Sequence, residues 1–98
     1  MTDRLRPQLI DKGDALVQVA ECLLATPPAR LGPEAVARRA ARRYTSAGDA
    51  YQQARLGLLA KRCHERAAQL WESIGEQDLA HAVRRLAKAM PVYWDGDV

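Results

Sequence analysis

The sequence of 98 residues contains no phenylalanine and no long run of β-branched residues. Such runs are the mark of β-strands, so their absence argues against a β-sheet protein. Alanine supplies much of the 48% apolar content, and the other abundant residues are strong helix formers. The composition therefore predicts one all-α domain with a thin core, in which the few tyrosines and tryptophans matter as packing anchors or contact points.

Segments that address a chain to a membrane are also missing. Asp3, Arg4 and Arg6 are followed by no continuous apolar run, and no apolar stretch is as long as the roughly 18 residues of a membrane helix. We therefore expect no signal peptide, no membrane span and a cytoplasmic location. Cys22 and Cys63 are expected to be reduced and buried in helices, because nothing in the sequence requires a disulfide.

The sequence lacks the signatures of catalysis and of metal binding as well. His64 and His81 form no H-x-x-x-H pair, no C-x-x-C is present, and Cys63 and His64 would point about 100° apart on a helix. There is no G-x-S-x-G motif and no phosphate-binding glycine loop. We expect a protein that is not an enzyme and holds no cofactor and no metal, with both histidines exposed or half-buried.

The chain does contain an internal similarity. Residues 39–63 align with residues 66–90 at a shift of 27. Each copy reads Ala-Ala, then an aromatic residue (Tyr44 or Trp71), then glycine followed by an acidic residue, then an apolar stripe. A fixed period of this size is typical of stacked helical hairpins, which serve more often as binding surfaces than as catalysts.

Apolar spacing and turn residues predict four helices. Their expected ranges are about 7–25, 33–47, 49–74 and 77–90, followed by a short acidic, aromatic tail at 91–98. Gly48 and Gly75 are expected to end the second and third helices. The expected fold is a four-helix antiparallel bundle or a set of stacked helical hairpins, with one long third helix. A break between residues 57 and 63 would instead divide that helix into two.

Each expected helix carries an apolar stripe, including the third and the last. We expect Tyr44 and Trp71 to be core residues as well. The stripe of the third helix consists of Leu56, Ala60, Cys63, Ala67, Leu70 and Ile74. The stripe of the last helix consists of Leu79, Ala82, Val83, Leu86 and Met90.

Residues 67–91 resemble part of a tetratricopeptide repeat. The spacing of Trp71, Gly75, Ala80 and Ala87 is similar to that family's pattern, and Pro91 lies one position short of its closing proline. The period of 27 differs from the family's 34, and Gln53 stands where the first copy should have a small residue. The resemblance implies a protein–peptide interaction role, with ligand contacts on a concave helical face.

These patterns favour a small non-enzymatic interaction module, either an adaptor or a self-associating protein such as a dimer. The partner would be a protein, bound near Tyr51, Leu58, Tyr93 and Trp94, because aromatic residues are frequent hot spots of interfaces.

The alternative is a basic nucleic-acid-binding or regulatory protein. The net charge is +3, and residues 30–88 hold twice as many basic as acidic residues. Four arginines of the second helix, Arg38, Arg39, Arg42 and Arg43, would contact phosphates in that case.

Overall fold

The computed structural model describes residues 2–90, which form four helices joined by turns. The bounds of the helices are α1 (Thr2–Ala25), α2 (Pro33–Gln53), α3 (Gly57–Ser73) and α4 (Gln77–Ala89). The prediction of an all-α helical bundle is therefore confirmed.

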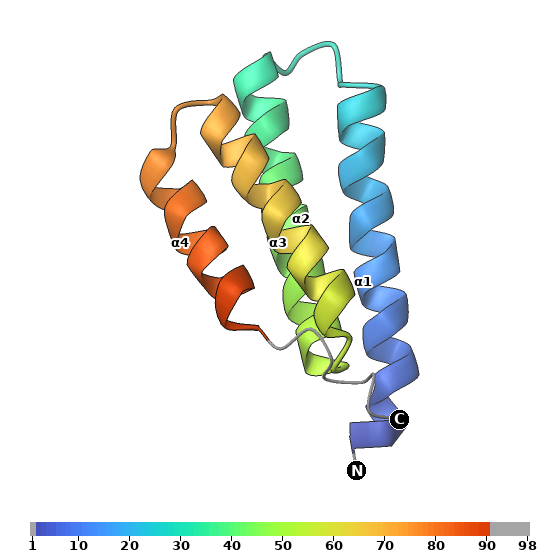
Figure 1. The fold of residues 1–98 in the computed structure, drawn as a ribbon. Helices are drawn as coiled ribbons and strands as arrows, with labels where there is room; N and C mark the ends of the chain where they lie inside the picture. The colour runs from blue at the N-terminus through green and yellow to red at the C-terminus, as the bar shows by residue number, and fades with distance from the viewer. Residues whose placement is uncertain (1, 91–98) are drawn as a thin grey trace.

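The helices form a row in which each one runs antiparallel to the one before it (Figure 1). The extensive contacts join α1 to α2, α2 to α3 and α3 to α4. In Figure 1, α1 and α4 lie on opposite sides of the α2–α3 pair. The two outer helices are therefore packed by a helix on one side, whereas α2 and α3 are packed on two.

The prediction of one long third helix is wrong. Helix α2 continues through Gly48 to Gln53, and the chain turns at residues 54–56 before α3 begins at Gly57. Gly48 lies inside α2 and does not end it. Its Cα lies against the side chain of His64. The alternative, a break between residues 57 and 63, is not found either, since the interruption lies at residues 54–56. Helix α1 begins at Thr2 rather than near Pro7, which it includes.

The turns that follow α2 and α3 have the same geometry. After α2, the N–H of Leu56 donates to the carbonyl of Tyr51, and that of Arg55 donates to Gln52. After α3, the N–H of Glu76 donates to Trp71 and that of Gly75 to Glu72. This pair of hydrogen bonds defines the Schellman motif, which requires a left-handed residue.

The left-handed residues of the two motifs are Arg55, with a φ of 63°, and Gly75, with a φ of 81°. The prediction that Gly75 ends the third helix is therefore confirmed. The structural correspondence between the turns pairs Arg55 with Gly75, whereas the sequence similarity pairs Gly48 with Gly75. The similarity at a shift of 27 thus does not place equivalent residues in equivalent turns.

The core is built from small residues with a few large ones between them. The stripe predicted for the third helix is confirmed, since Ala60, Cys63, Ala67 and Leu70 are buried and Leu56 and Ile74 pack against them. Tyr44 and Trp71 are also buried, as expected. Because alanine lets helix axes approach closely but buries little area, these aromatic rings supply a large share of the apolar contact.

Candidate interaction surfaces

Tyr51, which we predicted to contact a partner, belongs to the interior. Its ring packs over Gly13 of α1, where an added Cβ would lie 2.7 Å from the ring. Its hydroxyl donates a hydrogen bond to the carboxylate of Asp14. Burial, the hydrogen bond and the charge of Asp14 together raise the pKa of the Tyr51 phenol. Tyr51 therefore joins α2 to α1 and presents no surface to another molecule.

The other three residues of the predicted partner site are located differently from Tyr51. Leu58 is exposed at the first turn of α3. Tyr93 and Trp94 lie outside the described residues. Of the four predicted residues, Leu58 is thus the one that the structure shows as an exposed apolar side chain, just after the turn between α2 and α3.

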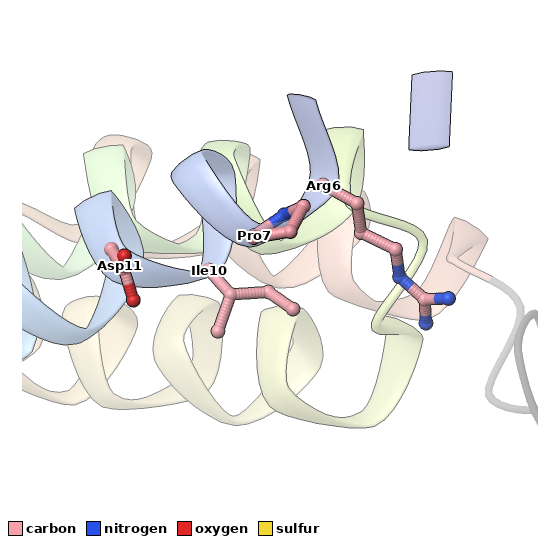
Figure 2. Close-up of a pocket in the computed structure, with 4 residues that line it drawn as sticks. All are labelled: Arg6, Pro7, Ile10 and Asp11. Atoms are coloured by element: carbon pink, nitrogen blue, oxygen red, sulfur yellow. The ribbon is translucent and has the colours of Figure 1, made fainter. Parts of the chain in front are cut away.

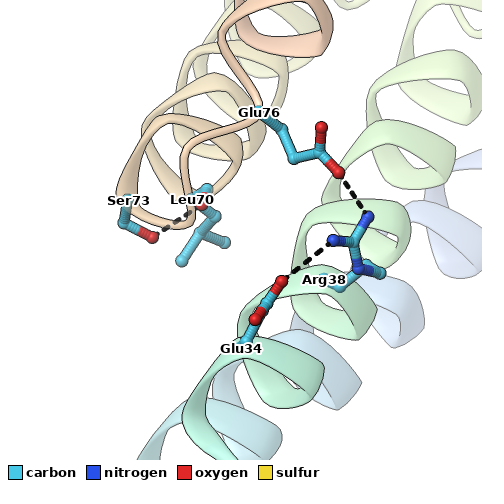
Figure 3. Close-up of polar contacts among 5 residues, drawn as sticks. All are labelled: Glu34, Arg38, Leu70, Ser73 and Glu76. Atoms are coloured by element: carbon cyan, nitrogen blue, oxygen red, sulfur yellow. Dashed lines mark hydrogen bonds and ion pairs between the residues drawn. The ribbon is translucent and has the colours of Figure 1, made fainter.

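Arg38 is committed to contacts within the fold (Figure 3). Its guanidinium donates to Glu76 at 2.8 Å and to Glu34 at 3.3 Å, and it lies 5.7 Å from the centre of the Trp71 ring. The hydrogen bond to Glu76 is the main cause that raises the pKa of Arg38. These contacts connect α2 to the residue before α4 and stack a cation over the buried tryptophan. Arg38 is therefore a structural residue.

Arg39, Arg42 and Arg43 remain available at the surface of α2. All three are exposed, and within the described part of the chain none of them forms an ion pair. By contrast, Arg84 of α4 is held by Glu72 in two hydrogen bonds, which lower the pKa of Glu72 and raise that of Arg84. Three free cations within two helical turns form a basic strip on α2.

The outer side of α1 carries an exposed apolar stripe of Ala15, Val19 and Cys22. Val19 is 45% exposed. The stripe borders an open depression of about 450 Å³, which is lined also by Gln18, Leu23, Thr26 and Pro28. The prediction that both cysteines are buried is wrong for Cys22, which is exposed, and correct for Cys63.

A second exposed stripe runs along α4 and consists of Leu79, Ala82 and Leu86. Leu79 is 41% exposed and Leu86 is 53% exposed. We expected these three residues in the core together with Val83 and Met90, which are indeed buried. The difference arises because, among the described helices, α3 is the one that packs extensively on α4, and one neighbour covers only part of an apolar face this wide.

Among the residues that the structure describes, His64 is the buried polar or charged residue, and it is 0% exposed. Neither ring nitrogen has a hydrogen-bond partner among the described residues, and Asp49 Oδ1 lies 3.9 Å from Nε2. Burial lowers the pKa of His64, and the charge of Asp49 opposes this effect. The expectation of an exposed or half-buried histidine holds for His81 and is wrong for His64.

The neighbouring Cys63 is buried too, and burial raises the pKa of its thiol to about 11. A thiol with so high a pKa is protonated at neutral pH and a poor nucleophile. In residues 2–90, no three histidine, cysteine or acidic side chains are grouped in a way that could hold a metal ion. Cys63 and His64 therefore act as packing residues of the α2–α3 interface.

A further depression of about 500 Å³ lies at the start of α1 (Figure 2). It is lined by Arg6, Pro7, Ile10 and Asp11. Figure 2 shows Arg6 and Asp11 at opposite ends of the depression with Ile10 between them. The two charged groups do not converge on one point, so the depression lacks the geometry of a catalytic pair.

No described helix has the length and apolar character needed to cross a membrane. No protein-family model matches the sequence. The comparisons with curated proteins and with solved structures likewise found no match.

Proposed function

We propose that this chain is a small non-enzymatic protein-interaction module that binds through the apolar stripes on its two outer helices. The observation that carries this proposal is the exposure of Leu79 and Leu86 on α4, together with that of Val19 on α1. The resemblance of residues 67–91 to a tetratricopeptide repeat agrees with such a role. The cytoplasmic location expected from the sequence is part of the same proposal.

The physical reason is that the end helix of a helical array is normally protected by a polar outer face. Here α4 instead exposes Leu79 and Leu86, two turns apart, and α1 exposes Val19 between the smaller Ala15 and Cys22. Fully burying an exposed leucine contributes about 1.5–3 kcal/mol. Because Leu79 and Leu86 are already about half buried, covering both contributes about 1.5–3 kcal/mol in total, against the roughly 8 kcal/mol of a micromolar affinity.

The proposal is tested with Leu79→Glu and Leu86→Glu, which place charge in the α4 stripe. Both positions are exposed, so the folded state should tolerate the change, which circular dichroism and thermal unfolding would check. The matched control is Leu58→Glu, which alters an exposed leucine outside the stripe. Partners identified by chemical cross-linking in the source cells would be purified and titrated against each variant.

We expect the α4 variants to weaken partner binding by at least about tenfold, with Leu58→Glu close to the unaltered chain. Loss of binding in Leu58→Glu alone would move the site to the start of α3. If neither a second copy of the chain nor another protein binds with a measurable affinity, the proposal is wrong.

Nucleic-acid binding is the second candidate, and the three free arginines of α2 favour it. Phosphate contacts by Arg39, Arg42 and Arg43 would make affinity fall steeply with salt. The test is a titration with random-sequence duplex DNA at about 50 mM and about 200 mM salt, using the triple Arg→Gln variant at these positions and Arg62→Gln as control. Absence of salt-dependent binding at the lower concentration would remove this candidate.

A further inference from the structure

We infer that the partner of each apolar stripe is a second copy of this chain, in which α1 of one copy packs antiparallel on α4 of the next. This inference rests on the proposed function and specifies that the binding partner is a second copy of the chain. The contact is head-to-tail, since two different surfaces meet in it.

The spacing of the two stripes fits an antiparallel contact. Along α4, the stripe residues are separated by three and then four positions, from Leu79 to Ala82 to Leu86. Along α1 read in the reverse direction, the separations are also three and then four, from Cys22 to Val19 to Ala15. If the two helices ran parallel, Val19 and Ala82 would be displaced from each other by one position. The antiparallel arrangement therefore keeps all three apolar pairs level.

The same register pairs large side chains with small ones. It places Cys22 opposite Leu79, Val19 opposite Ala82, and Ala15 opposite Leu86. A large residue facing a small one lets two helices interdigitate at close distance. Pairing α4 with another α4 would set leucine against leucine, and pairing α1 with another α1 would leave alanine against cysteine with little area buried.

The charges of the two helices favour the contact between unlike faces. Helix α4 carries Arg84, Arg85 and Lys88 against Asp78, whereas α1 carries one more acidic than basic residue over Thr2–Ala25. The antiparallel register brings Asp11 of α1 level with Met90 and Lys12 level with Ala89, so the attraction of Asp11 to Lys88 is partly offset by Lys12. A contact between two α4 helices would instead place basic side chains near each other, which opposes association.

The contact also continues the existing architecture. Because α4 runs antiparallel to α3, an α1 helix added antiparallel to α4 continues the alternation of helix directions seen in Figure 1. Each stripe spans only two turns, so the contact is small and association should depend on concentration.

Complementary variants give the sharpest test. Val19→Glu blocks the α1 stripe, and Leu86→Glu blocks the α4 stripe, both at positions that are already about half exposed. By light scattering after size exclusion, the unaltered chain should self-associate as concentration rises, and each variant alone should stay monomeric. A mixture of the two variants should form one heterodimer of twice the monomer mass, because it retains one intact α1 face and one intact α4 face.

Contacts between identical faces give different results. If Leu86→Glu alone still forms dimers, the contact joins α1 to α1, and if Val19→Glu alone does so, it joins α4 to α4. Either result overturns the inference. So does an unaltered chain that remains monomeric at several hundred micromolar, a concentration at which contacts of roughly millimolar Kd become visible.

Disulfide trapping tests the register independently. Cys22 is exposed and Cys63 is buried, so Cys22 is the thiol that can react between molecules. We expect Leu79→Cys to form a disulfide with Cys22 of the neighbouring copy under a mild oxidant, which takes up the two electrons as both thiols lose their protons. Leu86→Cys is the matched control, because its position lies two turns from Cys22 in this register. Equal trapping in both variants, or dimers linked by Cys22 alone, contradicts the register.

The alkylation rate of Cys22 separates the failure of this inference from that of the proposed function. In the unaltered chain, Cys22 should be alkylated quickly at low concentration and several-fold more slowly when the chain associates. A monomeric chain whose Cys22 is protected at every concentration would mean that the chain covers its own stripe, which overturns the inference. If the unaltered chain is monomeric but binds a different purified protein, and Leu86→Glu abolishes that binding, the inference is overturned and the proposed function remains intact.

Discussion

The Cα of Gly48 lies against the imidazole of His64 so closely that an added Cβ would stand 2.7 Å from both Cε1 and Nε2 of the ring. Glycine at this point of α2 lets a fully buried ring of α3 fit between the two helices. The contact explains why Gly48 is interior to a helix, where glycine otherwise costs about 1 kcal/mol relative to alanine.

Gly48→Ala should lower the free energy of unfolding by about 1–2 kcal/mol, because overpacking outweighs the gain in helix propensity. Urea unfolding measures the change. Ser46→Ala, at an exposed site on the same helix, is the matched control and should be neutral or slightly stabilising. Combining Gly48→Ala with His64→Ala should cost less than the sum of the two, and strict additivity would show that the ring is not the obstacle.

The stability of the protein should fall in mildly acidic solution because of His64. Burial lowers the pKa of this residue in the folded state, so between that lowered pKa and about 6.5 the unfolded chain binds more protons than the folded one. The contribution of His64 is thus complete above about pH 6.5 and is lost as the pH decreases through this window, by up to about 1.4 kcal/mol per pH unit.

Urea unfolding of the unaltered chain, His64→Gln and His81→Gln at several pH values between about 7.5 and about 5 measures this dependence. His64→Gln should flatten the profile, because glutamine does not titrate. His81→Gln should keep it, since His81 is exposed. Parallel profiles in all three proteins would assign the acid sensitivity to carboxylates.

The left-handed residues of the two Schellman turns predict opposite effects on stability. Replacing the glycine at position 75 should destabilise the fold, whereas introducing a glycine at position 55 should not. Gly75→Val should lower the free energy of unfolding by about 1–2 kcal/mol, because a positive φ strains a residue with a Cβ. No heavy atom lies within 4 Å of the added Cβ, so this cost comes from the backbone alone. Arg55→Gly removes such strain and should be neutral or stabilising by up to about 1 kcal/mol.

Thermal and urea unfolding of both variants would measure these changes. A loss of more than about 1 kcal/mol in Arg55→Gly would show that the side chain of Arg55 stabilises the turn beyond its backbone strain.

Trp71 is the large side chain at the end of α3, buried beneath the guanidinium of Arg38. Trp71→Ala should lower the free energy of unfolding by about 3–5 kcal/mol, since it removes buried area and leaves a cavity. Leu86→Ala, at an exposed leucine, is the control and should change stability by less than about 0.5 kcal/mol. A change below about 1 kcal/mol in Trp71→Ala would mean that the α3–α4 hairpin does not depend on this ring.

Much of the fold could be predicted from the sequence by local rules. Helix formers without β-branched runs predict an all-α chain, and the apolar spacing from Leu56 to Ile74 identified the buried side of α3. Gly75 was predicted correctly as a turn residue, because a glycine followed by polar residues and a new apolar stripe leaves few other conformations. Each of these inferences depends on residues near one another in the chain.

The turn at Arg55 could not be predicted in the same way. An arginine rarely takes a left-handed conformation, and Gly48, seven residues earlier, is the better local signal for a turn. The packing of Gly48 on His64 and of Tyr51 on Gly13 extends α2 past its glycine, and the chain then turns where those contacts end. Tertiary contacts outweighed local preference at this point.

The sequence by itself determined that the chain is helical, which residues form apolar stripes, and where α3 ends. Only the tertiary structure decided which stripes are covered. Val83 and Leu86 look alike in the periodic pattern of α4, yet Val83 is buried and Leu86 is exposed. The physical reason is that burial depends on the number of neighbouring helices, and a helix at the end of a row has a single neighbour within the described chain.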